Sequence, residues 1–240
     1  MFGTTDVGRI RKMNQDNYYF NSQQGIVVVA DGIGGRKGGE IASGIAVKTI
    51  RDAFLGCDNL LHESVNPFLK SNVQKVNQLI IESGQSDPSI EGMGTTLNCL
   101  LFVGSKVSIA HLGDSRTYLF YHNHFWQLTI DHSIGIYVKR GWIPQETLTE
   151  KGSNPDALVR ALGLSEHTEI DIYQKEIRQK EIYITCSDGL TSMVSDIKIA
   201  ELISLHQNRL EDLPGILVAE ANKNGGKDNI TVVVSEVSKY

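Results

Sequence analysis

Residues 95–128 read TTLNCLLFVGSKVSIAHLGDSRTYLFYHNHFWQL and contain four strand-like runs in close succession. The runs cover 95–103, 106–112, 115–121 and 124–128 and are rich in β-branched and aromatic residues. Only a few turn residues separate them, such as the pairs GS, GD and HN. Connections this short bring successive strands back beside one another, so this stretch predicts antiparallel hairpins.

The flanking sequence adds further strands and helices. Strand-like runs cover residues 17–21, 25–30, 168–174, 181–186 and 229–237. Apolar residues at i, i+3, i+4 spacing predict amphipathic helices over roughly 38–55, 66–83, 195–205 and 210–224. A helical pair between early strands and antiparallel hairpins indicates an α+β layered fold.

The chain reads as one domain. Its 240 residues are sufficient for a sizeable core, and no repeat or linker divides it, so we expect a single catalytic domain over 1–240. Scattered Gly and Pro in the segment 131–160 predict short helices and loops, which we interpret as a flap over a site.

Composition excludes several classes of protein. The net charge is −5 and no long Lys/Arg run occurs, so we expect no nucleic-acid partner. The apolar runs are far shorter than the roughly 18 residues of a membrane span, and the N-terminal segment has no apolar signal core. We therefore expect a cytoplasmic protein. The three scattered cysteines indicate core residues rather than a disulfide framework or a zinc site.

Four aspartates lie at the ends of apolar strands. Asp31 follows the run VVVA, and Asp188 follows YITC and one serine. Asp228 precedes the run NITVVV, and Asp114 lies in the turn between two strands. A single aspartate beside Gly or Asn is typical of a turn, but four in this setting predict one acidic site.

The ligand type indicates a class of metal. Clustered carboxylates repel one another and would not all ionise without cations. Oxygen ligands without His or Cys suit Mg²⁺ or Mn²⁺. Two such ions about 3.5–4 Å apart, bridged by water, supply a hydroxide near neutral pH and neutralise a phosphoryl group.

The N-terminal segment TTDVGRIRKMNQDNYYF adds two candidates. The guanidinium of Arg11 can hold a phosphate through two parallel hydrogen bonds, although an isolated arginine is more often a solvated surface charge. Asp16 comes directly before a strand, where it could hold a metal-bound water.

Taken in order, the motifs resemble one family. They are TDVGRIRKMNQDN, VVVADGIGG, GMGTTL, AHLGDSR, LTIDHS, LVRALG, CSDGL and KDNITVVV. Each is weak alone, but together they cover nearly the whole chain in the order of the protein phosphatase 2C (PPM) family. The bacterial single-domain members are the most similar. The resemblance implies a four-layer αββα sandwich, with two central, mainly antiparallel sheets flanked by helix pairs and the metal site at one end.

The resemblance also implies roles for individual residues. Asp31 would bridge two core ions, and Gly32 would give its backbone carbonyl to one of them. Asp188 and Asp228 would complete the core ligands, and Asp114 would share a third, weaker ion with Asp188.

Three further roles lie outside this ligand set. Asp16 would act through waters, Arg11 would clamp the substrate phosphate, and Asn229 would orient the site from outside the ligand shell.

The chain departs from the family pattern at two positions. Gln15 stands where the family usually has Glu, so one charge is lost. Ile33 stands where eukaryotic members often have a His that is proposed as the general acid. Ile33 cannot donate a proton, and our hypothesis is that a water on the third ion, at Asp114 and Asp188, protonates the leaving group.

Other aromatic residues have structural interpretations. We expect His111 to be a core or inter-strand residue, and His132 to have a structural or substrate-rim role. Trp126 and Trp142 are expected to pack in the core or the flap.

The predicted function is that of a metal-dependent protein serine/threonine phosphatase. Water activated by two metals would attack phosphorus directly while Arg11 and the metals balance the charge. Two alternatives are a catalytically inactive, phosphatase-like regulatory binding protein and a metal-dependent nuclease or other phosphoesterase, which would need a basic groove. The expected partners are phosphorylated proteins, including those of a Ser/Thr kinase, and we expect a monomer.

Overall fold

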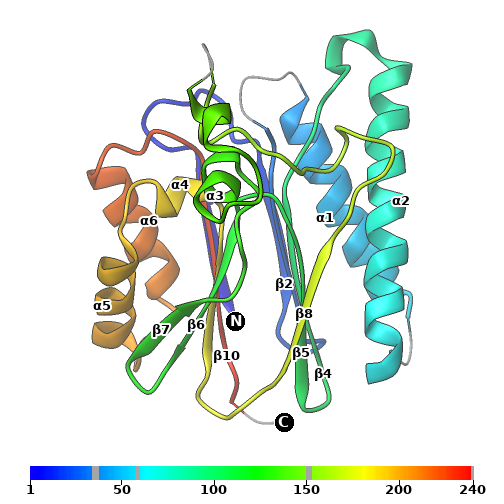
Figure 1. Ribbon diagram of the computed structural model, residues 1–240. Helices are drawn as coiled ribbons and strands as arrows, with labels where there is room; N and C mark the ends of the chain where they lie inside the picture. The colour runs from blue at the N-terminus through cyan, green and yellow to red at the C-terminus, as the bar shows by residue number, and fades with distance from the viewer. Residues whose placement is uncertain (34–37, 58–59, 150–152, 239–240) are drawn as a thin grey trace.

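Two antiparallel sheets pack face to face between two pairs of helices (Figure 1). The computed structural model describes residues 1–33, 38–57, 60–149 and 153–238. The first sheet has the order β1-β10-β9-β6-β7 and the second β2-β3-β4-β5-β8. The predicted α+β sandwich is therefore confirmed.

Each sheet contains strands from distant parts of the chain. The first sheet comprises β1 (Phe2–Asp6), β10 (Ile230–Glu236), β9 (Ile182–Cys186), β6 (Arg116–Tyr121) and β7 (His124–Gln127). The second comprises β2 (Asp16–Asn21), β3 (Ile26–Asp31), β4 (Leu97–Val103), β5 (Lys106–Leu112) and β8 (Asp171–Glu176). The hairpin stretch thus contributes two strands to each sheet, because the chain changes sheets at the turn between β5 and β6.

The helices cover the two outer faces. Helices α1 (Gly39–Leu55) and α2 (Val65–Ser86) lie over the second sheet, while α5 (Asp196–His206) and α6 (Leu213–Lys223) lie over the first (Figure 1). Shorter helices are α3 (Ile134–Lys139) and α4 (Asp188–Thr191), with 3₁₀ turns at His62–Ser64, Pro88–Ile90 and Gln145–Leu148. In the described part of the chain, no helix is both long enough and apolar enough to cross a membrane.

Strand β3 shows why central strands are apolar without a break. Ile26, Val28 and Ala30 pack with the cluster beneath α1 and α2. Val27 and Val29 point the other way, into the cluster between the two sheets. Because successive side chains of a strand alternate between faces and both faces are covered, every position from Ile26 to Ala30 is buried. The same packing holds the end of β3 rigidly at the rim of the sandwich.

The structure differs from the sequence prediction in several details. Strand β1 and helix α4 were not predicted, and β8 begins at Asp171 rather than at 168. Asp171 pairs with His111 near the end of β5, so the strand starts where a partner is available. Trp126 lies on the edge strand β7 with 45% of its surface exposed, so the prediction of a core position is wrong there. Trp142 packs edge-on against Tyr137 within the flap segment.

Candidate metal centre

The predicted aspartates meet at one end of the sandwich. Asp31 ends β3, and Asp188 begins α4 directly after β9. Asp228 precedes β10, and Asp114 lies in the turn between β5 and β6. All four line a single cavity of about 340 Å³ together with Arg11. Both sheets contribute, so the cavity exists only where the sheets are packed together.

The backbone of Asp31 is fixed by the neighbouring threonines. Its carbonyl accepts hydrogen bonds from the Thr96 amide at 2.9 Å and the Thr95 hydroxyl at 2.8 Å. Its amide donates to the Thr96 hydroxyl at 3.0 Å. These bonds fix the backbone from which the Asp31 carboxylate enters the cavity, and they account for the two threonines of the GMGTTL motif.

Asp16 lies opposite Asp31 in the β2–β3 register and is 5% exposed. Its Oδ2 accepts hydrogen bonds from the hydroxyls of Ser187 at 2.7 Å and Thr231 at 2.6 Å. Its Oδ1 is buried and, within the described residues, has no hydrogen-bond partner, as is true of Oδ1 of Asp188. Buried carboxylate oxygens are rarely left unsatisfied, so both oxygens are suited to a cation or its bound water.

Burial and the negative charges of neighbouring aspartates raise the pKa of these carboxyl groups. Burial, together with the charges of Asp16 and Asp188, raises the pKa of Asp31 well above its usual value. Burial also raises the pKa of Asp114 to about 8 and that of Asp16 to about 6, in both cases with a further contribution from Asp188. For Asp188, burial and the charge of Asp228 raise the pKa to about 6. Together they form a site that favours positive charge.

The donor set fits hard divalent cations. Among its described lining residues the cavity has five carboxylates, the four predicted ones and that of Asp156, and no His or Cys. Carboxylate oxygens are the ligand type of Mg²⁺ and Mn²⁺. Over the residues that the structure covers, no three His, Cys, Asp or Glu side chains already form a metal cage. Mg²⁺ sites need no such cage, because water and backbone oxygens complete the coordination around one or two carboxylates.

Gly32 lies where only a glycine can fit. A Cβ at this position would collide with the carbonyl group of Gly39 and would lie 2.8 Å from the carbonyl oxygen of Gln15. The Gly32 amide donates to that Gln15 carbonyl at 3.1 Å. The side chain of Gln15 donates to Glu40 at 3.1 Å, so Gln15 supports the loop from outside the cavity.

Arg11 reaches the cavity from the N-terminal loop. Its guanidinium donates to Oδ2 of Asp228 at 2.7 Å, and this bond raises the pKa of the arginine further. Both side chains are about one-third exposed, so the pair lies at the mouth. Asn229 lies behind them, and its side chain bonds to backbone groups of Gln15, Val7 and Met13.

The two histidines lie outside the cavity lining. His111 is fully buried between Asn98 and the Ile130 carbonyl, as expected of an inter-strand residue. The His132 ring is also buried, with Nδ1 accepting from the Gly113 amide at 3.1 Å and Nε2 lying 3.2 Å from Asp171. His132 therefore supports the turn that carries Asp114.

Several residues of the site were not predicted from the sequence. Thr96, Asn154, Asp156, Ala157, Leu158 and Leu164 also line the cavity. Ser187, directly after β9, and Thr231, in β10, hold Asp16 from segments far away in the chain. The serine before Asp188 and the threonine pair in GMGTTL were visible as parts of motifs, but no local pattern marks Leu158 or Leu164.

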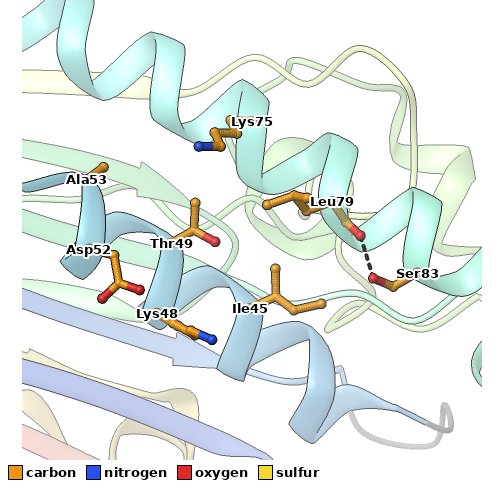
Figure 2. Close-up of a pocket in the computed structure, with 8 residues that line it drawn as sticks. All are labelled: Ile45, Lys48, Thr49, Asp52, Ala53, Lys75, Leu79 and Ser83. Carbon is orange, nitrogen blue, oxygen red and sulfur yellow. Dashed lines mark hydrogen bonds between the residues drawn. The ribbon is translucent and has the colours of Figure 1, made fainter.

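A larger groove lies elsewhere, between α1 and α2. It encloses about 470 Å³ and is lined by Ile45, Thr49 and Leu79 with Lys48, Lys75 and Asp52 among the charged residues (Figure 2). Both lysines and Asp52 are exposed. Because the groove has only one carboxylate, it lacks the converging acidic groups of the cavity at the sheet ends.

Comparison with known proteins identifies the family. The family model for protein phosphatase 2C matches residues 9–212. The serine/threonine phosphatase stp of Listeria monocytogenes is 36% identical over 237 residues, covering 97% of this chain and 93% of that protein. The serine/threonine protein phosphatase PstP of Mycobacterium tuberculosis is 33% identical over 241 residues, covering 98% of this chain and 44% of PstP.

Solved structures give the same result. The serine/threonine phosphatase Stp1 of Staphylococcus aureus has a TM-score of 0.88 at 28% identity, covering 99% of this chain and 94% of that one. The catalytic domain of PstP in complex with two manganese ions has a TM-score of 0.85 at 31% identity, covering 99% and 97%. Sequence and structure agree over nearly the whole chain, and the chain belongs to the protein phosphatase 2C family.

Proposed function

We propose that the acidic cavity hydrolyses phosphoserine and phosphothreonine in proteins by direct attack of water on phosphorus. Membership of the family makes this chain a metal-dependent serine/threonine phosphatase rather than an inactive binding protein. The observation that carries the mechanism is the convergence of Asp31, Asp188 and Asp228 in one cavity with Arg11.

The carboxylates are the proposed metal ligands. Asp31, Asp188 and Asp228, with the backbone carbonyl of Gly32, would hold two core ions, either Mn²⁺ or Mg²⁺. When bound, such ions lower the pKa of a coordinated water and neutralise charge on the phosphoryl group. The Oδ1 atom of Asp16, which has no hydrogen-bond partner among the described residues, would accept a hydrogen bond from a water in the same site.

Arg11 is the proposed substrate clamp. Its guanidinium already lies at the mouth, where it donates to Asp228. A phosphate oxygen can replace that carboxylate oxygen as acceptor, because a guanidinium binds both groups in the same geometry. Arg11 would then orient the phosphoryl group and balance its charge as the ester bond breaks. Asn229 would keep the Arg11 loop in place.

The proposal includes a third, weaker ion held by Asp114 and Asp188. Ile33 lines the cavity and has no proton to donate, so another group must protonate the leaving oxygen. The raised pKa of Asp114, caused by burial and by the charge of Asp188, supports a cation in this corner of the cavity. Removal of Asp114 should therefore slow hydrolysis of serine and threonine phosphates, which have poor leaving groups.

Further parts of the proposal concern the whole protein. We propose one catalytic domain over 1–240, with residues of about 131–160 acting as a flap that influences the choice of substrate. The substrates are phosphoproteins, and a Ser/Thr kinase is the proposed source of their phosphate. A monomeric state and a cytoplasmic location belong to the same proposal.

Phosphate release from a phosphothreonine peptide tests the mechanism. The rate is measured with Mn²⁺, with Mg²⁺ and with EDTA, for the wild type and for Asp188→Ala and Asp114→Ala. We expect no turnover in EDTA and a loss of at least about 100-fold in kcat/KM for Asp188→Ala, since even partners of metal ligands are worth 10–100-fold. Asp114→Ala should lose activity on the peptide.

Asp52→Ala is the matched control. Asp52 is an exposed aspartate in the groove between α1 and α2 (Figure 2), and its removal should leave the rate unchanged. Turnover in EDTA, or full activity of Asp188→Ala, would contradict the metal mechanism. Full activity of Asp114→Ala on the peptide would contradict the proposed third ion, but it would not contradict the two core ions.

A further inference from the structure

Apolar side chains share the cavity with the aspartates. Ile33, Leu158 and Leu164 line the same cavity as Asp31 and Asp188, and we call these three apolar residues the apolar shelf. Neither the proposed metals nor a phosphoryl group makes use of apolar surface. The shelf is therefore available to another part of the substrate.

The shelf is held by the packing of distant segments. The Ile33 amide donates to the Gly94 carbonyl at 3.0 Å. The side-chain tips of Ile33 and Leu164 both converge over Gly94, where an added Cβ would lie 2.8 Å and 3.0 Å from them. The absence of a side chain at Gly94 thus makes room for Ile33 and Leu164 to meet.

The backbone beside Leu158 and Leu164 is equally well anchored. Leu158 forms a β-bridge with Ser133, and the next amide, of Val159, donates to the His132 carbonyl at 2.7 Å. The Gly163 amide donates to the side chain of Asn77 at 2.8 Å. A preformed apolar surface binds without the entropic cost of ordering a loop.

The shelf faces solvent in part. Leu164 is 39% exposed, although it borders a cavity that is otherwise lined largely by charged and polar groups. An apolar side chain of a bound peptide would cover this surface and remove it from water. Because the shelf is continuous with the acidic site, such a side chain must belong to the same peptide as the phosphorylated residue.

We propose that the apolar shelf selects phosphopeptides with an apolar side chain two residues from the phosphorylated residue. This specificity rests on the proposed function. In an extended peptide, side chains two positions apart point to the same side, so a phosphothreonine in the acidic site places that neighbour beside the shelf. Ile33, Leu158 and Leu164 would then be specificity-determining residues for a partly apolar phosphoprotein segment.

The test compares three phosphothreonine peptides that differ only at the positions two residues before and two residues after the phosphothreonine. One carries Leu two residues before the phosphothreonine, one carries Leu two residues after it, and the third carries Ser at both places. Hydrolysis is measured with Mn²⁺, and each kcat/KM is divided by that for p-nitrophenyl phosphate, which has no peptide neighbour. We expect one Leu peptide to be preferred over the Ser peptide by about tenfold, the lower end of what a hydrophobic pocket gains from apolar contact.

Leu164→Ser is the test variant, and Leu205→Ser is its matched control. Leu205 is a leucine on α5 with 69% of its surface exposed, and it is not among the cavity-lining residues. We expect the preference to fall to about threefold or less in Leu164→Ser, because one apolar contact is lost, and to persist in Leu205→Ser.

Two results would overturn the proposal. One is equal hydrolysis of all three peptides by the wild type, and the other is a preference that Leu164→Ser retains in full. Failure of the proposed function is distinguishable, since the wild type would then hydrolyse neither p-nitrophenyl phosphate nor any peptide in the presence of metal.

Discussion

The side chain of Asn229 ties three separate backbone groups together. Its Oδ1 accepts from the Gln15 amide at 2.8 Å, and its Nδ2 donates to the carbonyls of Val7 and Met13 at 2.9 Å each. These groups flank the loop that carries Arg11. One buried amide therefore both stabilises the chain end and positions the proposed phosphate clamp.

Replacement of Asn229 by Ala should destabilise the protein. The change removes three hydrogen bonds and leaves their backbone partners poorly satisfied, so the free energy of unfolding should fall by about 2–4 kcal/mol. Urea denaturation measures the change. Asn224→Ala is the control, because Asn224 makes a single exposed bond to the Met193 carbonyl and should cost less than about 1 kcal/mol. Equal losses in the two variants would contradict this account.

Strands β8 and β9 belong to different sheets and are joined by a buried ion pair. Nζ of Lys175 lies 2.6 Å and 2.7 Å from the two carboxylate oxygens of Glu181. The Tyr183 hydroxyl donates to the same carboxylate at 2.7 Å. Glu181 is 2% exposed and lies at the end of β9 away from Asp188, so this pair joins the two sheets far from the acidic cavity.

Lys175→Met should therefore destabilise the protein without changing the acidic cavity. It leaves a buried carboxylate without its cation, which costs about 3–5 kcal/mol for a fully buried pair. Because the Lys175 side chain is 30% exposed, we expect a smaller loss of about 2–3 kcal/mol. Chemical denaturation of Lys180→Met is the control, since Lys180 is 74% exposed and should lose less than about 1 kcal/mol. A loss in Lys175→Met no larger than this would contradict the interpretation.

Over the whole molecule, metal binding and protonation compete for the same carboxyl groups. The pKa of Asp114 is raised to about 8 by burial and the charge of Asp188. At pH 7 without metal this group is therefore protonated, and a bound cation would displace the proton. We expect Mn²⁺ binding at pH 7 to release protons, and titration calorimetry in two buffers of different ionisation enthalpy measures the release. An observed enthalpy that does not depend on the buffer would contradict it.

The raised pKa of Asp114 also makes the stability of the fold depend on pH. A carboxyl with a raised pKa binds more protons folded than unfolded, so the metal-free protein should lose stability as pH rises from 6.5 to 8. The lowered pKa values of the buried His111 and His132 have the opposite effect, which declines above about pH 6.5 as the histidines of the unfolded chain lose their protons. Urea denaturation in EDTA tests the sign, and Asp114→Asn should reduce the slope. Stability that increases over this range would be the contrary result.

Much of the fold was predictable because local pattern and tertiary packing agree. The alternating turns of 95–128 predicted β4 to β7, and the apolar run of β3 reflects burial on both faces. Strand β1 was missed because the sequence FGTTD has only one large apolar residue, Phe2, and becomes a strand by pairing with β10. The start of β8 was misplaced because β5 provides no partner before Asp171.

For the site as well, some features were predictable from local sequence and others depended on tertiary packing. The sequence alone determined that aspartates follow or precede buried strands, because an acidic residue beside an apolar run is a local feature. The packing of the two sheets decided that Asp31 and Asp188 meet in one cavity with Leu158 and Leu164, and that Ser187 holds Asp16. Such contacts depend on strand register and sheet packing between segments far apart in the chain, which no local pattern specifies.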